Sequence, residues 1–332
     1  MGTKSLQLGR AFGLVMRTLP IALVRLGVLL LFWLAALVYL AIVGGLAWLV
    51  SQAIPIAGII VAIIGLGGMG YLYYLARRYV LYLIKAAQIA VMAELLVREA
   101  LPAGANQLAW GKQRVQERFG EASIMFVVDQ MVAGIISVFT GAVYGIASIL
   151  PGGALRSLAQ IVNRVVRFSL TYVDEAILAR AFWTDSEDVW TNARDGVVLY
   201  GMVWKPLLMN AVALMVLSYI PFVLVWIIVA APIGFLANAI SSSFAGWSII
   251  ATLLLAWLVK VAIGDTFAMA AMLAAYQRST EGLTPDPGVT AKLEQISSKF
   301  RGLQDRARQA MGGRAVPPAP EDGPPQPFDV GA

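Results

Sequence analysis

The stretch LGVLLLFWLAALVYLAIVGGLAWLV, Leu26–Val50, decides the fold class. It carries no charged side chain, and it exceeds the roughly 20 residues that a helix needs to cross the hydrocarbon core of a bilayer. The whole chain of 332 residues is 59% hydrophobic and 13% charged. Because a soluble domain has about a quarter charged residues, this composition indicates a membrane environment. We therefore predict an all-α polytopic integral membrane protein.

Other apolar runs extend this prediction to two hairpins of membrane-spanning helices. The second helix of the first hairpin, at about 56–76, carries Gly58, Gly65, Gly67, Gly68 and Gly70, which would allow close packing against a neighbour. The second hairpin has predicted spans at about 207–231 and 246–272, with PIGFLANAISSS as its connection.

The distribution of charge predicts the membrane orientation. Basic clusters fall in the N-terminus, 77–121, 156–205 and 278–314, whereas the turns at 51–55 and 232–243 are uncharged. Since basic loops stay in the cytoplasm, we expect both termini to be cytoplasmic in a prokaryotic inner (plasma) membrane. Four to six transmembrane helices result, depending on whether 122–183 crosses the bilayer or is re-entrant or interfacial.

Composition shifts divide the chain into segments of different character. They are an amphipathic N-terminal segment (1–25), a two-span hairpin (26–76), a cytoplasmic helical segment (77–121), a helical hairpin with a polar stripe (122–183), an amphipathic connector (184–205), a second two-span hairpin (206–278), a cytoplasmic amphipathic helix (279–314) and a disordered Pro-rich tail (315–332).

Missing residue types narrow the chemistry. The chain contains neither cysteine nor histidine, which removes thiol nucleophiles, imidazole bases and the usual transition-metal ligands. The one GLGGMG run, at 65–70, lies inside an apolar span and lacks the lysine of a phosphate-binding loop. We therefore expect no enzymatic activity, no cofactor, no metal and no nucleic-acid partner.

Charged residues inside apolar surroundings are the candidate functional residues. In the predicted helix 154–183, polar side chains from Arg156 to Asp174 recur at helical spacing and form a stripe on one face. A charge at the bilayer centre costs about 2.5–3.5 kcal/mol, so such residues must meet water or an opposite charge. The substrate-pathway candidates are Asp129, Arg164, Arg167, Asp174, Glu175, Lys260 and Asp265. A surface or packing role for the stripe is the alternative.

Lys260 and Asp265 interrupt the last apolar run. In an α-helix they lie about 140° apart around the axis, so we expect them to pair with other helices and not with each other. Alternatively, both are anchors at the inner membrane boundary, with the lysine stem reaching toward the headgroups.

Three further segments each allow two interpretations. Residues 4–25 form either an amphipathic helix on the inner headgroups or a basic flank that orients the first span. Tyr71, Tyr73, Tyr74, Tyr79 and Tyr82 form an interfacial belt or a cage for a quaternary ammonium group. The apolar seam of helix 288–310, from Val289 to Ala307, covers the protein's own bundle or binds a partner helix or second protomer.

Three stretches resemble the choline transporter-like family: LTYVDEAILARAF (Leu170–Phe182), DVWTNARDGVVLY (Asp188–Tyr200) and GDTFAMAAMLAAYQRSTEG (Gly264–Gly282). The resemblance covers about a third of the chain and implies organic-cation or lipid-headgroup transport in an all-helical fold. The chain lacks that family's additional spans and large external loop, so its substrate and mechanism do not carry over. The chain also resembles uncharacterised small prokaryotic multi-span membrane proteins.

Together these features predict a membrane transporter or permease-like protein for an organic cation or lipid head group, with the lipid bilayer and a small molecule as its partners. The alternative is a non-catalytic membrane scaffold. In that case the cytoplasmic amphipathic helices, 185–204 and 288–310, dock a protein partner or mediate self-association.

Overall fold

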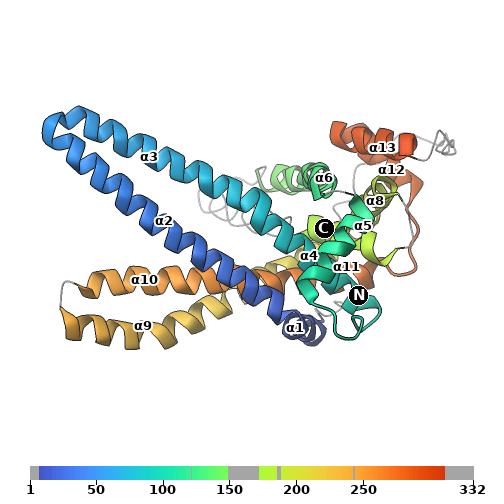
Figure 1. Ribbon diagram of the computed structural model, residues 1–332. Coiled ribbons are helices and arrows are strands. Elements are labelled where there is room, and N and C mark those ends of the chain that lie inside the picture. The colour runs from blue at the N-terminus through green and yellow to red at the C-terminus, as the bar shows by residue number, and fades with distance from the viewer. Residues whose placement is uncertain (1–6, 121, 149–171, 185–187, 242–243, 311–332) are drawn as a thin grey trace.

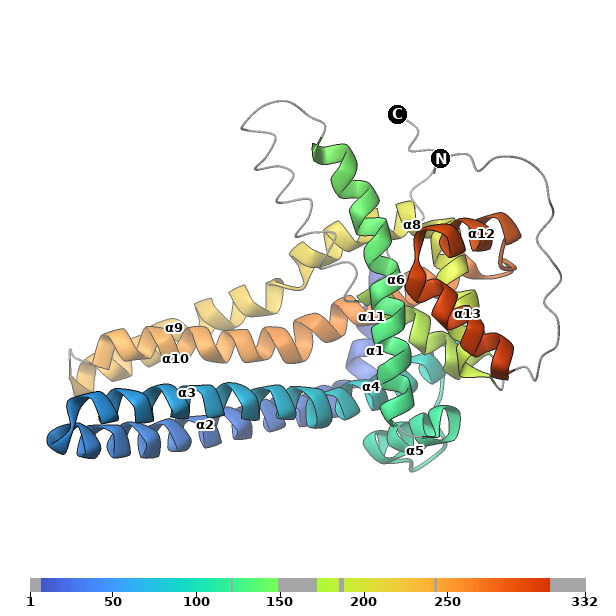
Figure 2. The ribbon, with the colours of Figure 1, turned by 90° about the horizontal axis from the view of Figure 1, so that it is seen from above.

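The computed structural model describes residues 7–120, 122–148, 172–184, 188–241 and 244–310. All regular secondary structure in these ranges is helical, which confirms the predicted all-α fold. Four helices are long and apolar enough to cross a membrane, and a bent helix pair raises that number to five. The four are Leu19–Ala53, Pro55–Val97, Ala213–Ala239 and Ser248–Thr280. Two long hairpins project in the same direction from a helical head (Figure 1, Figure 2).

The first hairpin consists of α2 (Leu19–Ala53) and α3 (Pro55–Leu75), which join at Ile54 and pack along each other (Figure 1). Three of the predicted glycines, Gly58, Gly65 and Gly68, face α2 closely. A Cβ atom on Gly58 would lie 2.7 Å from the Ala47 carbonyl oxygen, and one on Gly65 would clash with Val43. Gly67, in contrast, faces open space. Small residues therefore determine the packing on one face of α3 only.

The second hairpin consists of α9 (Ile220–Ile240) and α10 (Phe244–Val259), and its boundaries correct the predicted span 207–231. The chain breaks at Ser218 and Tyr219, because Pro221 favours the first turn of a new helix. The predicted connection at 232–243 was also wrong: residues 232–240 are helical, and α9 continues through Pro232. Apolar side chains continue beyond that proline, and a membrane helix tolerates the loss of one backbone hydrogen bond.

Both hairpins return to the head in the same way. After α3 comes a π-helical turn, η1 (Ala76–Leu81), and then α4 (Tyr82–Val97). After α10 comes a second π-helical turn, η2 (Lys260–Gly264), and then α11 (Asp265–Thr280). Both α4 and α11 are buried along most of their length. A single lysine lies near each π-helical turn, Lys85 in α4 and Lys260 in η2.

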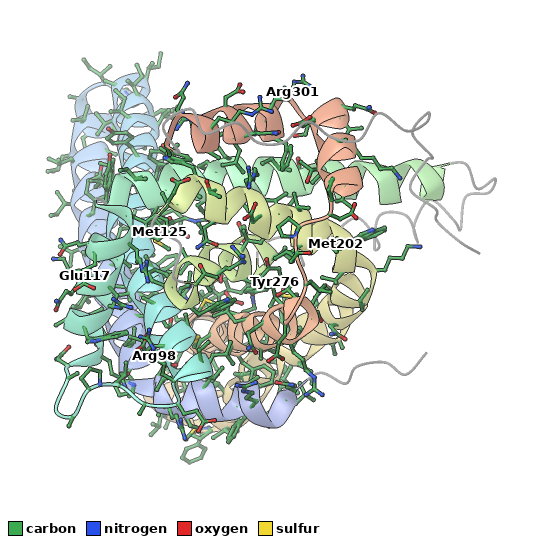
Figure 3. The ribbon with its side chains drawn as sticks, turned by 90° about the vertical axis from the view of Figure 1, so that its right-hand side faces the viewer. Arg98, Glu117, Met125, Met202, Tyr276 and Arg301 are labelled. Atoms are coloured by element: carbon green, nitrogen blue, oxygen red, sulfur yellow. The ribbon has the colours of Figure 1, made fainter. Side chains whose placement is uncertain are left out.

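The head surrounds α4 and α11. Its other helices are α1 (Leu8–Arg17), α5 (Gln107–Phe119), α6 (Ala122–Ser148), the helical segment 172–183, α8 (Val189–Leu217), α12 (Pro287–Ile296) and α13 (Ser298–Ala310). In Figure 3 the hairpins lie behind the head, with Tyr276 inside it and Arg301 at its outer edge. The Tyr276 hydroxyl donates a hydrogen bond of 2.9 Å to the Gly196 carbonyl, which ties α11 to α8.

The N-terminal segment contains an amphipathic helix, and its placement on the inner headgroups stays a prediction. Helix α1 buries Ala11, Leu14 and Val15 within the head. Arg10 donates a hydrogen bond to the backbone carbonyl of Leu96. The helix does not run unbroken from 4 to 25, because Thr18 separates α1 from α2. The apolar face of α1 therefore packs on protein.

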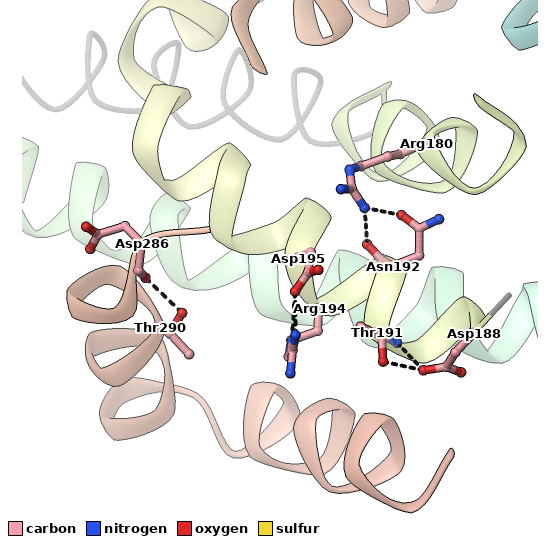
Figure 4. Close-up of polar contacts among 8 residues, drawn as sticks. All are labelled: Arg180, Asp188, Thr191, Asn192, Arg194, Asp195, Asp286 and Thr290. Atoms are coloured by element: carbon pink, nitrogen blue, oxygen red, sulfur yellow. Dashed lines mark hydrogen bonds and ion pairs between the residues drawn. The ribbon is translucent and has the colours of Figure 1, made fainter. Parts of the chain in front are cut away.

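Helix α8 begins directly after Asp188. The Asp188 carboxylate accepts hydrogen bonds from the backbone N–H groups of Trp190 and Thr191, a standard N-cap. Nearby, Arg180 of segment 172–183 donates to Asn192, and Arg194 pairs with Asp195 (Figure 4). The Arg180–Asn192 contact ties α8 to segment 172–183, whereas the other contacts lie within α8 and its N-cap.

The predicted continuous helix 288–310 is instead two helices. It breaks at Ser297, whose hydroxyl accepts a hydrogen bond from the Phe300 backbone N–H and begins α13. In α13, Phe300, Leu303 and Ala307 are buried against the protein's own head. The interpretation that this seam covers its own bundle therefore holds for α13.

We expect Gly58→Val to lower the midpoint of thermal unfolding in detergent, because the new side chain would collide with the backbone of α2. Overpacking of this kind costs about 1–3 kcal/mol. Gly67→Val is the matched control on the same helix and should leave the midpoint nearly unchanged. Equal losses in both variants would contradict the packing described for α2 and α3.

Candidate functional site

Two lysines, one at the base of each hairpin, form the centres of two adjacent polar groups. Lys260 is 5% exposed, and the Lys85 side chain is 25% exposed. A buried ammonium group is stable only beside an opposite charge or another favourable electrostatic partner. Each lysine has such a partner, and the two sets of partners meet in segment 172–183.

Lys260 is held by a carboxylate and aromatic rings. Its Nζ lies 2.6 Å from Asp265 Oδ1, 5.0 Å from the centre of the Tyr219 ring and 5.5 Å from the centre of the Trp257 ring. The Tyr172 hydroxyl donates a 2.9 Å hydrogen bond to the same Asp265 oxygen. We refer to Tyr172, Tyr219, Trp257 and Asp265 as the ammonium cage. Aromatic faces together with one carboxylate are the surroundings that bind organic ammonium ions.

The prediction that Lys260 and Asp265 are poor partners for each other was wrong. It assumed α-helical geometry, whereas residues 260–264 form a π-helical turn. A π-helix closes its hydrogen bonds between residues i and i+5, which brings side chains five positions apart onto nearly the same face. The backbone irregularity thus creates the ion pair. Lys260 bonds within the protein and is covered by it.

The second polar group contains three acidic residues, Asp129, Asp174 and Glu175, which we refer to as the carboxylate cluster. Glu175 forms an ion pair with Lys85 and is 2% exposed. Asp129, from α6, is 8% exposed, and Asp174 is partly buried. Burial raises the pKa of Asp174, and the nearby Asp129 carboxylate raises that pKa further. Burial likewise raises the pKa of Glu175, although Lys85 acts in the opposite direction.

One helical turn links both groups. Tyr172 bonds to Asp265 at the base of the second hairpin, and Glu175 bonds to Lys85 at the base of the first. Both side chains come from segment 172–183, which therefore connects the two hairpins through polar contacts. The junction lies where the apolar arms enter the head.

The structure brings together the predicted site residues that it describes. Asp129, Asp174 and Glu175 gather around Lys85, while Lys260 and Asp265 pair beside Tyr172. Arg164 and Arg167 lie outside the described residues.

Sequence reasoning missed four of the residues that complete the two groups. Lys85 interrupts an apolar run, YLIKAAQIAV, as Lys260 does, so the same signal could have found it. Tyr172, Tyr219 and Trp257 carry no such signal, because aromatic residues are common throughout the apolar helices. Only the fold shows that Tyr219 and Trp257 face the Lys260 ammonium group and that Tyr172 bonds to its partner Asp265.

The tyrosine cluster at 71–82 does not form the alternative cage. Tyr71, Tyr73, Tyr74 and Tyr79 are between 42% and 64% exposed, an arrangement that fits an interfacial belt. The rings of Tyr71 and Tyr74 stack on each other, with their centres 6.5 Å apart. Tyr82 differs, because its ring packs edge-on against Phe126 inside the protein.

Comparison of the chain with models of protein families, with curated proteins and with solved structures gives no match. The functional argument therefore depends on the geometry of the chain itself.

We predict that Lys260→Met lowers the free energy of unfolding by about 1–3 kcal/mol, because it leaves the partly buried Asp265 carboxylate without its cation. The double variant Lys260→Met/Asp265→Asn should recover most of that loss, since no unpaired charge remains. Denaturant titration of the detergent-solubilised protein measures both. A double variant as unstable as the single one would show that the pair is not energetically coupled.

Proposed function

We propose that the protein is a permease-like membrane protein for a small organic cation with an ammonium group. The ammonium cage is the observation that supports this proposal most directly. In this structure the protein's own Lys260 fills the cage, and its Nζ is an alkylammonium ion. A substrate with the same group would need the same carboxylate and ring faces.

The surroundings of the cage fit this role. Asp265 supplies a charge of the correct sign, and its side chain remains 20% exposed, so it is not sealed from solvent. A substrate ammonium could replace Lys260 at Asp265 without a net change in charge, provided that the lysine stem swings away.

The four apolar helices support a membrane location. In three of them only 11% of the most apolar stretch is buried, so most of that surface needs lipid or another chain. We propose that both hairpins cross a prokaryotic inner membrane, with the head and both termini in the cytoplasm.

The topology is testable because the chain contains no native cysteine. Single cysteines at Ile54 and Ser241, in the two hairpin turns, should react with a membrane-impermeant maleimide added outside intact cells. Cysteines at Gly104 and Gly282 should react only after the membrane is permeabilised. Labelling of all four positions from the same side would contradict the proposed crossing.

Transport is tested with the full-length protein in proteoliposomes and tetramethylammonium as the probe. We expect Asp265→Asn to abolish uptake, because the cage loses its charge. Asp195→Asn is a matched control, since Asp195 is also 20% exposed and forms a 2.7 Å ion pair, with Arg194 in the head. Equal uptake by both variants, or no uptake by the unmodified protein, would contradict the proposal.

Binding provides an independent measure of the same cage. In Lys260→Ala the cage loses its internal ammonium group, so tetramethylammonium should raise the thermal midpoint of this variant. The ion should not stabilise Lys260→Ala/Asp265→Asn.

A second candidate is the membrane scaffold, which the surface of α13 supports. Its inner face is buried, but Arg301, Asp305 and Arg308 are exposed at the edge of the head (Figure 3 labels Arg301). A partner would therefore bind a polar face and not the apolar seam. If Arg301→Glu/Arg308→Glu loses a stoichiometric partner that co-purifies with the unmodified protein, the scaffold is favoured.

A further inference from the structure

The ammonium cage stands at the surface of the second hairpin. Tyr219 is 40% exposed and Trp257 is 46% exposed, whereas Lys260, which both rings face, is 5% exposed. The two aromatic residues belong to two of the candidate membrane spans, Ala213–Ala239 and Ser248–Thr280. Exposed surface on such a span contacts lipid when the span crosses a bilayer. The two rings would therefore separate the cage from the bilayer.

The position of the cage along the hairpin fits the level of lipid headgroups. Lys260 begins the π-helical turn at which α10 ends and the chain enters the head (Figure 2). Further along the arm, Val223 and Ile227 of α9 and Leu253 of α10 are exposed and apolar. Tyrosine and tryptophan favour the boundary between headgroups and hydrocarbon. A lipid at this place would set its headgroup against the cage and its acyl chains along the arm.

Lys260 is the part of the cage that is free to move. A Cβ atom on Gly264 would collide with the carbonyl oxygen of Ser218, so the backbone before Tyr219 already lies in close contact with the π-helical turn. Asp265 accepts the hydrogen bond from the Tyr172 hydroxyl. A lysine ammonium, in contrast, stands on a flexible four-carbon stem. Entry of a ligand therefore requires a swing of the lysine and no displacement of the Tyr219 wall.

The charge of Lys260 determines which ligand can displace it. An ammonium ion that takes its place at Asp265 restores that ion pair, but the lysine keeps its own charge and loses the carboxylate. Moving a charge out of its ion pair in largely buried surroundings costs free energy unless a new counter-ion meets it. A ligand with an anion beside its ammonium group would supply that counter-ion. Phosphate suits this role, because lysine binds it as a point charge.

We propose that the ammonium cage binds a zwitterionic lipid from the bilayer, one whose headgroup carries an ammonium group and a phosphate. The ammonium group binds Asp265 and the faces of Tyr219 and Trp257, and the phosphate pairs with the displaced Lys260. All four charges are then matched. This inference rests on the proposed function, since it assigns the ammonium group of the substrate to a lipid headgroup.

Native mass spectrometry of the full-length protein in detergent tests this assignment with two lipids. Dioleoylphosphatidylcholine and dioleoyl-trimethylammonium-propane share their acyl chains and their trimethylammonium group, but only the first has a phosphate. We expect the unmodified protein to bind the phosphatidylcholine about tenfold more tightly, because a charge-assisted phosphate contact is added. Equal binding, or tighter binding of the phosphate-free lipid, would overturn the proposal.

Variants of Lys260 give a reversal that a merely structural lysine would not produce. Lys260→Ala vacates the cage and removes the partner of the phosphate, so the phosphate-free lipid should now bind about tenfold more tightly. Lys260→Arg keeps the positive charge and should keep the preference for phosphatidylcholine. Asp265→Asn should weaken the binding of both lipids, whereas Asp195→Asn should change neither affinity. An unchanged preference in Lys260→Ala would overturn the assignment of the phosphate to this lysine.

Free phosphocholine distinguishes a lipid from a soluble ligand with the same two charged groups. It lacks acyl chains and should not displace the bound phosphatidylcholine at equal concentration. Displacement would assign the cage to a soluble ligand and would overturn the choice of a lipid. The proposed function fails separately. If tetramethylammonium does not stabilise Lys260→Ala, the cage is not an ammonium site. If it does, but both lipids bind equally to the unmodified protein, only the lipid assignment fails.

Discussion

A buried charge must meet an opposite charge, and this constraint determines how the two hairpins join the head. Each hairpin brings one lysine out of its apolar arm to the point where protein begins to cover it. Burying an ammonium ion alone costs several kcal/mol, so each lysine requires a fixed carboxylate. Glu175 and Asp265 meet that need, and segment 172–183 contacts both lysine sites through Glu175 and Tyr172. The polar junction therefore orients two arms that have few other contacts with each other.

The same constraint explains why the two lysine sites differ in chemistry. At Lys260 one ammonium faces one carboxylate, and aromatic rings complete the surroundings. At Lys85 three acidic groups of the described residues, Glu175, Asp174 and Asp129, act on one ammonium group. The first arrangement suits exchange of one ammonium for another, whereas the second gathers several carboxyl groups around one lysine. Tyr172 contacts one lysine site and Glu175 the other, and both residues lie within one helical turn. The two lysine sites are therefore joined through one short segment of the chain.

Much of the architecture follows from the sequence, because apolar length and helix-starting residues are local properties. The run 26–50 predicts a spanning helix without reference to any other segment, and it lies within the single helix α2. Three features did not follow from local reasoning. The π-helical turn at Lys260 pairs residues that α-helical geometry separates, α9 continues through Pro232, and Ser297 interrupts an apparently continuous seam. The gathering of Tyr219 and Trp257 around Lys260, with Tyr172 bonded to Asp265, depends on tertiary packing.

The distance between the two hairpins tests the polar junction most directly. Spin labels on cysteines at Leu34 of α2 and Ile228 of α9, both exposed, report that distance by pulsed electron paramagnetic resonance in nanodiscs. With the junction intact, the account predicts one narrow distance distribution. In the labelled protein carrying Tyr172→Phe and Glu175→Gln, which removes both contacts of segment 172–183, the distribution should broaden or shift. An unchanged narrow distribution in that variant would show that the hairpins are held by something other than the junction.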